Sequence, residues 1–347
     1  MIPSFSHRVG LSLVGAVAAA AIADGAWASH PNYPPQPTVI EYAVDPAWPQ
    51  RPAELGPRGA VPGIAVDRQD RIWCLERCPV PVQVYTKQGS LARSWGQGEF
   101  RSPHSVRFDR QGNVWIVDNA DHVVKKFTPE GRRLLTLGTP GTPGDDETHF
   151  NGPTDVAVSP AGDVFVSDGY GNRRVVHLDA SGKFVKAWGQ YGGGRGQFCL
   201  PHQIVMDSEG RLYVADRNSG RIEVFDQRGT CLNEWAHLIM PWGLCITPGD
   251  EIWACGSSPQ AWYREGSYPP PKDQIFLRFS RDGRARQLWT VPLGADGREK
   301  PGECNWLHAV AVDSEGNLYG GDINGKRIQK FARLAATPAG ALGAASE

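Results

Sequence analysis

The sequence lacks an excess of charge of either sign. Its 36 Lys and Arg residues balance 37 Asp and Glu residues, which leaves a formal net charge of −1 over 347 residues. A protein that binds nucleic acid needs a basic face that displaces counterions from phosphate. No such basic stretch stands out along the chain, so we expect no nucleic-acid partner.

Long hydrophobic runs are absent beyond the N-terminus. There, Arg8 precedes an apolar run from Leu11 to Ala23, and Ala26-Trp27-Ala28 supplies the small residues that a signal peptidase recognises. The run is shorter than the about 20 apolar residues of a spanning helix and is followed by Asp24. We therefore predict a secretory signal over residues 1–28 rather than a membrane anchor. The mature protein is expected to be exported, periplasmic or secreted, with no membrane span.

Closely spaced cysteine pairs are also scarce. The seven cysteines are an odd number, so at least one thiol is unpaired unless chains are bridged, and the pairing stays open. Cys74 and Cys78 are close in sequence, but no second close pair completes a four-thiolate zinc site. We do not expect structural zinc at the cysteines.

Turn-forming residues, in contrast, are abundant and recur with a period. The 41 Gly and 28 Pro fall at spaced positions, which indicates many short strands rather than disorder or long helices. The repeated unit is an apolar strand, a Gly turn, a second strand that ends in Asp, and a third strand that ends in a large apolar residue. Four clear copies begin at Pro103, Pro153, Pro201 and Leu307, and two weaker ones at Val61 and Pro241.

This repeat predicts an all-β fold, a six-bladed β-propeller of four-stranded blades over residues 61–331. Each copy spans roughly 45 residues, the length of one propeller blade. No fourth strand follows Phe331, and an open ring would leave an unpaired edge. We therefore expect the alternating run Thr38–Val44, within an N-terminal lead-in of residues 29–60, to close the ring. Residues 332–347 are expected to form a loose tail.

The fifth copy carries an insertion, Ser257–Asp273, that is rich in aromatic residues and proline. It is either a lid or a long loop.

Three histidines share one register of the repeat. When the copies are aligned on their first strand, alternate copies have His104, His202 and His308, and the others have Pro62, Thr154 and Trp242. First strands line the channel of a propeller, so alternate blades would direct three imidazoles to one point. Three neutral nitrogens with a fourth position open are the ligand set of a catalytic zinc. The alternative is three unrelated polar side chains near the channel, which the regular spacing disfavours.

These residues also carry a family resemblance. The stretches Pro153–Val158, Val164–Tyr170, Pro201–His202 and Ala215–Arg217 keep the order and spacing of a known group. Over residues 60–331 the chain resembles NHL-repeat propellers, and among them it is similar to the peptidyl-α-hydroxyglycine α-amidating lyase family.

The resemblance implies an enzyme that cleaves the N–C bond of a peptidyl-α-hydroxyglycine, a peptide or small-molecule substrate, to an amide and glyoxylate. The three zinc ligands of the family match His104, His202 and His308, its active-site tyrosine matches Tyr170, and its two arginines match Arg217 and Arg77. Tyrosine would take the proton of the substrate hydroxyl, and arginine would hold the substrate carboxylate. Structural alternatives are a hairpin cap for Tyr170 and an ion pair with the repeat Asp for Arg217.

Two departures bear on the reaction. The family has an Asp directly after the third histidine that bridges to a bound calcium, whereas this chain has Ala309, so zinc is expected and calcium is in doubt. Trp306-Leu307 stands where the family has Met-Pro. A non-catalytic NHL propeller that binds a peptide or a sugar, and a metal-dependent lactonase, are the alternative functions. The natural substrate and the oligomeric state stay open.

Overall fold

The computed structural model describes residues 38–39, 42–236, 239–258, 273–334 and 337–338. The predicted signal peptide and most of the predicted insertion lie outside the described residues. The chain divides into two units. One is Ile40–Ala335, and the other combines residues 1–39 and 336–347, where β1 (Thr38–Val39) pairs antiparallel with β26 (Thr337–Pro338). None of the helices among the described residues is long and apolar enough to cross a membrane.

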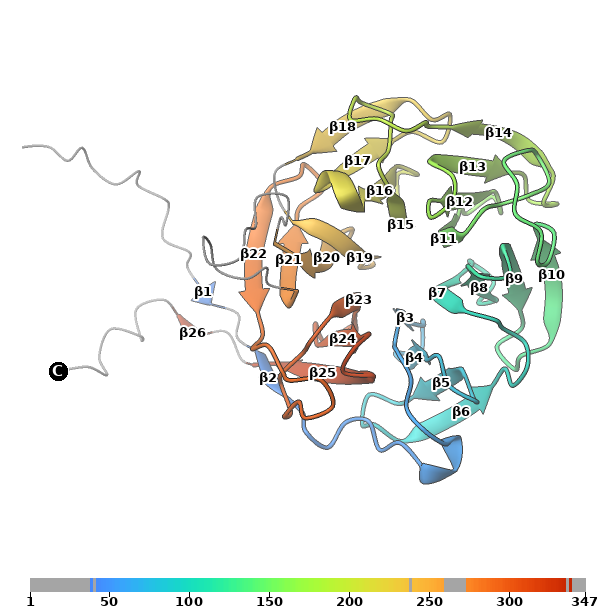
Figure 1. Ribbon diagram of the computed structural model, residues 1–347. Coiled ribbons are helices and arrows are strands. Elements are labelled where there is room, and N and C mark those ends of the chain that lie inside the picture. Colours follow the sequence, from blue (N-terminus) through green and yellow to red (C-terminus); the bar gives the residue numbers. More distant parts are fainter. Residues whose placement is uncertain (1–37, 40–41, 237–238, 259–272, 335–336, 339–347) are drawn as a thin grey trace, which may run out of the picture. The chain divides into compact units, whose positions relative to one another are not determined.

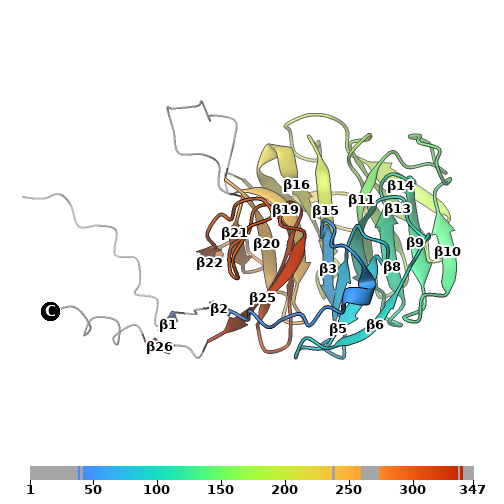
Figure 2. The same ribbon diagram turned by 60° about the horizontal axis from the view of Figure 1, so that its bottom comes forward.

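The larger unit is the predicted six-bladed propeller of four-stranded antiparallel blades (Figures 1 and 2). Each blade runs outward from the channel in chain order. Blades 1 to 3 are β3 (Gly63–Val66), β4 (Ile72–Leu75), β5 (Val82–Tyr85) and β6 (Leu91–Trp95); β7 (Pro103–Phe108), β8 (Val114–Asp118), β9 (Val123–Phe127) and β10 (Arg133–Leu137); β11 (Pro153–Val158), β12 (Val164–Asp168), β13 (Arg174–Leu178) and β14 (Phe184–Trp188). Blades 4 and 5 are β15 (Pro201–Met206), β16 (Leu212–Asp216), β17 (Arg221–Phe225) and β18 (Cys231–Trp235); β19 (Met240–Ile246), β20 (Ile252–Ser257), β21 (Ile275–Phe279) and β22 (Ala285–Thr290).

Blade 6 confirms that an N-terminal strand closes the ring. Its inner strands are β23 (Leu307–Val312), β24 (Leu318–Asp322) and β25 (Arg327–Arg333), and its outer strand is β2 (Tyr42–Val44). Val44 pairs with Phe331 and Tyr42 with Arg333, so the last blade extends two residues past the predicted end at Phe331. Of the predicted closing run, the part that joins the blade is β2. Two short 3-10 helices, η1 (Ala53–Leu55) and η2 (Arg217–Ser219), follow β2 and β16.

The hydrophobic core lies between the blades. Six clusters of buried apolar side chains each join two neighbouring blades, and the cluster between blades 6 and 1 is the one that seals the ring. Because both faces of each blade are covered in this way, the second strands are buried at every position, as in β12 and β16.

The repeated Asp at the end of the second strand positions the histidine strands. Asp216 Oδ1 accepts hydrogen bonds from the backbone N–H of Cys199 (2.9 Å) and Leu200 (2.8 Å), which immediately precede Pro201 and His202. Asp118 and Asp322 each bind two consecutive backbone N–H groups in the same way, directly before the strands that carry the other two histidines. A buried carboxylate therefore fixes the entry of each of these strands.

The two weaker copies differ in their first turn. The clear copies have Gly there with positive φ, whereas blades 1 and 5 have Asp70 (φ 57°) and Asp250 (φ 59°). Asp tolerates this left-handed conformation better than most residues with a side chain. Each carboxylate also accepts a hydrogen bond from a backbone N–H of the neighbouring blade, Ser314 for Asp70 and Ser208 for Asp250. The departure from the repeat thus adds a contact between blades.

We expect Asp216→Ala to lower the free energy of unfolding by about 3 kcal/mol or more, because two backbone N–H groups and the buried Arg221 guanidinium, 3.1 Å away, lose their acceptor. Urea unfolding would measure the loss. Asp226→Ala is the matched control, since Asp226 also accepts two backbone N–H groups but in an outer turn near solvent. Equal losses in the two variants would contradict the role of the buried anchor.

Candidate metal centre

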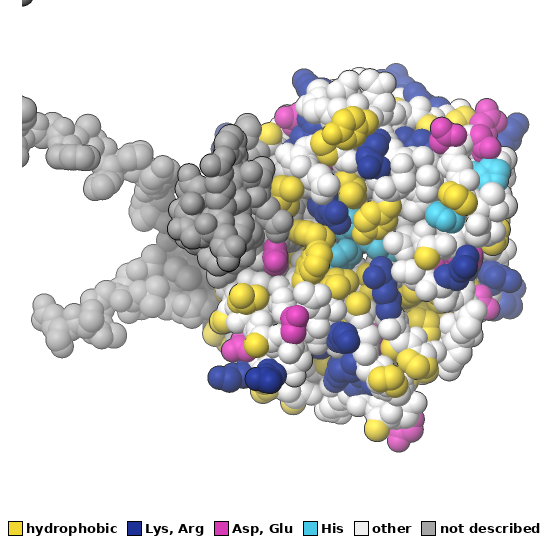
Figure 3. Space-filling model, in the orientation of Figure 1, with side chains coloured by type: hydrophobic (Ala, Val, Ile, Leu, Met, Phe, Trp, Pro, Cys, Tyr) yellow, Lys and Arg dark blue, Asp and Glu magenta, His cyan; other side chains and the backbone are white. Residues whose placement is uncertain are grey.

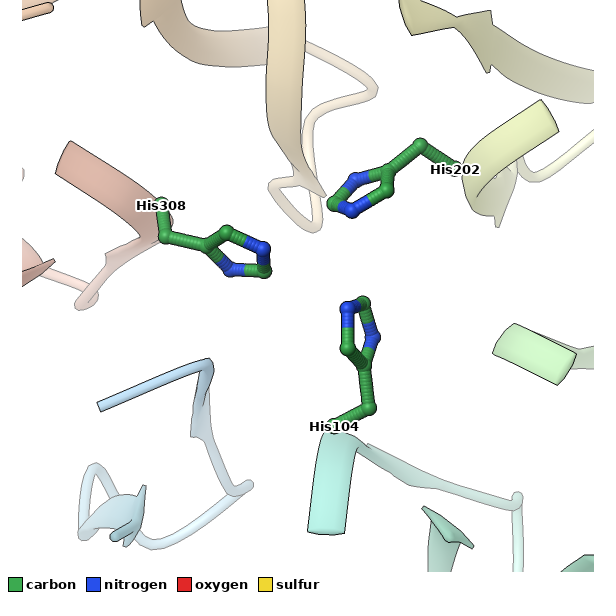
Figure 4. A group of neighbouring side chains, drawn as sticks. All are labelled: His104, His202 and His308. Atoms are coloured by element: carbon green, nitrogen blue, oxygen red, sulfur yellow. The ribbon is translucent and has the colours of Figure 1, made fainter. Parts of the chain in front are cut away.

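Three histidine side chains from alternate blades point to one place in the channel (Figure 4). His104, His202 and His308 occupy the second position of β7, β15 and β23. Their ring centroids are 5.0 Å (His104 to His202), 5.1 Å (His104 to His308) and 4.9 Å (His202 to His308) apart. One ring nitrogen of each lies within 4.8 Å of those of the other two. The side chains therefore meet as the register of the repeat predicts.

Hydrogen bonds between blades fix which nitrogen faces the centre. Each Nδ1 lies within hydrogen-bond distance of a backbone carbonyl on the following blade, at 2.6 Å for Thr154, 2.6 Å for Trp242 and 2.9 Å for Pro62. A carbonyl oxygen only accepts, so Nδ1 must carry the proton in each ring. The Nε2 atoms are left with free lone pairs, which is the tautomer that a metal requires when Nε2 is the ligand.

The surroundings keep the three rings neutral. Burial depresses the pKa of His104 and His202 well below its usual range, with the positive charge that His308 would carry as a second cause. Burial also lowers the pKa of His308 to about 3. Metal ligation needs deprotonated imidazoles, and burial supplies them at any pH near neutrality.

Tyr170 closes one side of the centre. Its hydroxyl oxygen lies 2.9 Å from His104 Nε2 and 3.1 Å from His202 Nε2. Both nitrogens can only accept a hydrogen bond, and the phenol has a single proton to donate. One nitrogen therefore receives the proton, and the lone pair of the other nitrogen faces the phenol oxygen without a proton between them. A cation among these atoms would satisfy all of them. The donor set thus fits Zn²⁺, with three imidazole nitrogens and a further position open.

Two arginines, Arg217 and Arg77, lie near Tyr170. The Arg217 guanidinium lies 5.9 Å from the centroid of the Tyr170 ring, and Arg77 donates from Nε to the carbonyl of Pro103 (3.2 Å), directly before His104. Burial raises the pKa of Tyr170, while Arg217 and Arg77 both act to lower it. Figure 3 shows Lys and Arg side chains beside hydrophobic ones around the central hollow, with histidine at its bottom.

The described part of the chain does not show the ion pair between Arg217 and the repeat Asp that was the alternative role for Arg217. Within the described residues, the repeat carboxylate Asp216 pairs with Arg221 at 3.1 Å, and no ion pair to Arg217 is formed. Arg217 instead begins η2, where its guanidinium stacks 4.4 Å from the centroid of the Trp242 ring. Trp242 shares the register of the histidines, but its contact with Arg217 could not be read from the sequence.

A partly buried guanidinium that reaches across the channel is a feature that the sequence did not reveal. Arg107 of blade 2 forms an ion pair with Asp155 of blade 3 and hydrogen bonds with Gln203 Oε1 of blade 4 (3.1 Å) and the Leu244 carbonyl of blade 5 (3.0 Å). Blades 2 and 5 face each other across the ring, so this side chain crosses the channel. Ala309 is buried in the apolar cluster between blades 6 and 1.

Comparisons with known proteins agree with the fold and point to one family. The NHL repeat family matches residues 150–178 and 198–225. A probable peptidyl-alpha-hydroxyglycine alpha-amidating lyase of Caenorhabditis elegans is 30% identical over 258 residues, covering 73% of this chain and 70% of the relative.

Two further similar proteins are a much longer relative and a solved structure with low sequence identity. Peptidyl-glycine alpha-amidating monooxygenase B of Xenopus laevis is 34% identical over 70% of this chain, which spans 27% of the length of that relative. A solved streptogramin B lyase structure superposes with a TM-score of 0.54 at 12% identity, covering 86% of this chain and 98% of that one. At this identity the superposition supports the fold alone.

We expect the metal-free protein to lose stability as the pH falls below about 6.5, the pKa of an unfolded histidine. The folded-state pKa values are depressed, so the unfolded chain binds more protons in this range and the folded state is penalised. The free energy of unfolding should fall by up to about 1.4 kcal/mol per pH unit for each histidine. For His308 this continues down to its folded pKa of about 3.

Urea unfolding in the presence of a chelator would measure this slope. His308→Gln should remove the share of one histidine, because glutamine does not titrate. An unchanged slope in this variant would contradict the assignment of neutral, buried imidazoles.

Proposed function

Because the chain belongs to the peptidyl-alpha-hydroxyglycine alpha-amidating lyase family, we propose that it is an exported zinc-dependent lyase that cleaves the N–C bond of a peptidyl-α-hydroxyglycine or a related carbinolamide. The products would be an amide and glyoxylate. The observation that carries the proposal is the convergence of three neutral Nε2 atoms and the Tyr170 hydroxyl beneath two arginines.

The reaction needs one proton to be removed and one to be supplied. The substrate hydroxyl loses its proton, its oxygen forms the carbonyl of glyoxylate, the C–N bond breaks, and the nitrogen takes a proton to become the amide. Zinc bound by the three histidines would supply positive charge that orients the hydroxyl and makes it more acidic. Tyr170, held between His104 and His202, is placed to accept the hydroxyl proton and return it to the leaving nitrogen.

The two arginines act on the substrate and on Tyr170. Both lie near enough to the Tyr170 oxygen to favour its phenolate, although burial outweighs them in the metal-free protein. A guanidinium also binds a carboxylate through two parallel hydrogen bonds. Arg217 and Arg77 would therefore orient the carboxylate that leaves as part of glyoxylate.

The proposed enzyme also has defined terminal segments and a defined cellular location. We assign residues 1–28 to a cleaved signal, 29–60 to the lead-in that contains the closing strand, 61–333 to the catalytic propeller, whose last strand ends at Arg333, and 334–347 to a tail. Export to the periplasm or the outside follows from the signal. Zinc is the proposed cofactor, and Ala309 in place of the Asp of the family keeps calcium outside the proposal.

We expect the purified mature protein to contain a single zinc ion per chain and to release glyoxylate from an α-hydroxyglycine peptide. His202→Ala should lose both properties, because it removes one of three ligands. Metal analysis and a glyoxylate assay measure the two outcomes separately. His149→Asn, which changes a histidine outside the centre whose Nδ1 bonds to Asp146 at 2.9 Å, is the control and should keep both. Zinc without glyoxylate release would support the metal centre and contradict the reaction.

Tyr170→Phe separates proton transfer from metal binding. The variant keeps the ring and all three histidines, so its zinc content should equal that of the parent. Loss of the proton acceptor should lower kcat by roughly 10²-fold to 10⁴-fold. If kcat changes by less than about threefold, Tyr170 is not the base.

A further inference from the structure

Two tryptophans stand apart from the rest. Trp242 and Trp306 are half-buried and belong to none of the core clusters, whereas every other tryptophan among the described residues packs into a cluster between blades. Packing between blades therefore does not account for these two large side chains. A pair of large aromatic side chains that remains partly open to solvent is typical of a binding surface.

Both side chains lie next to the metal centre. The Trp242 ring centroid is 6.1 Å from that of His202 and 6.0 Å from that of His308. Trp306 precedes His308 by two residues and meets Trp242 edge to face, with centroids 4.7 Å apart and an interplanar angle of 86°. The indole N–H of Trp242 donates to Ser257 Oγ (3.1 Å), which fixes the orientation of this ring.

The pair continues a line of side chains that begins at Tyr170. Arg217 lies over both the Tyr170 ring (5.9 Å) and the Trp242 ring (4.4 Å), and Trp306 follows Trp242. Blades 3, 4, 5 and 6 each contribute one of these four residues. The line leads from the proposed base, past the proposed carboxylate-binding guanidinium, to an aromatic surface.

We propose that Trp242 and Trp306 form an aromatic subsite for the side chain of the residue that precedes the hydroxyglycine. This inference rests on the proposed function. Consecutive Cα atoms of a peptide are about 3.8 Å apart, so a side chain one residue from the reacting carbon can reach the Trp242 ring, about 6 Å from two ligand histidines, and the Trp306 ring that contacts it. The substrates are then peptides with an aromatic or large apolar residue at this position.

The test compares two substrates, acetyl-Phe-α-hydroxyglycine and acetyl-Ala-α-hydroxyglycine. The parent should favour the Phe substrate by roughly tenfold in kcat/KM, the size expected for an aromatic contact together with its buried area. Trp306→Ala should reduce this preference to within about threefold, and Trp306→Phe should retain most of it. Leu288→Ala, which truncates an exposed apolar side chain on the outer strand β22, should leave the preference unchanged.

A second measurement does not depend on catalysis. Calorimetry with acetyl-Phe-Gly and acetyl-Ala-Gly, which lack the reacting hydroxyl, should show tighter binding of the Phe peptide by the parent and equal binding by Trp306→Ala. Absence of glyoxylate from both substrates would overturn the proposed reaction, and the binding data would still decide on the subsite. Equal affinity of the parent for the two peptides, or an unchanged preference in Trp306→Ala, would overturn the subsite.

Discussion

The centre depends on hydrogen bonds that pass from each histidine to the next blade. In each case Nδ1–H donates to the carbonyl that occupies the same register as the histidine, on Thr154, Trp242 or Pro62. The bond sets the tautomer and the ring orientation, and it requires the two blades to be in register. The carboxylates at the ends of the second strands hold the histidine strands at their entry, so the geometry of the centre is built into the repeat itself.

The sequence predicts those features that the repeat encodes. The blade count and the meeting of the histidines follow from one register, because a closed ring places equal sequence positions at equal positions around the channel. The closing strand follows from the missing fourth strand after Phe331. The two weaker copies are harder to recognise, since Asp70 and Asp250 adopt the left-handed turn that Gly occupies in the clear copies. Their interblade hydrogen bonds become visible only when neighbouring blades are placed together.

Features that break the symmetry could not be predicted. Arg107 finds its partners 48, 96 and 137 residues further along the chain, and no local pattern signals contacts across so wide a separation. The stacking of Arg217 on Trp242 depends on the turn at η2, whose residues Arg217–Ser219 carry no repeat signal. Trp306 is visible in the sequence as a departure from the Met-Pro of the family, but only the structure pairs it with Trp242.

The side chain of Arg107 limits which molecules can pass through the central channel. It spans from blade 2 to blade 5 and is anchored on blades 3 and 4 as well, so the channel is blocked on one side of the histidines. A polypeptide cannot thread through such a ring. A ligand that reaches the histidines must therefore enter by one of its ends and leave through the same opening of the channel. The remainder of the ligand stays outside the channel. A site of this shape is open to the end of a chain, whatever the length of the chain behind that end.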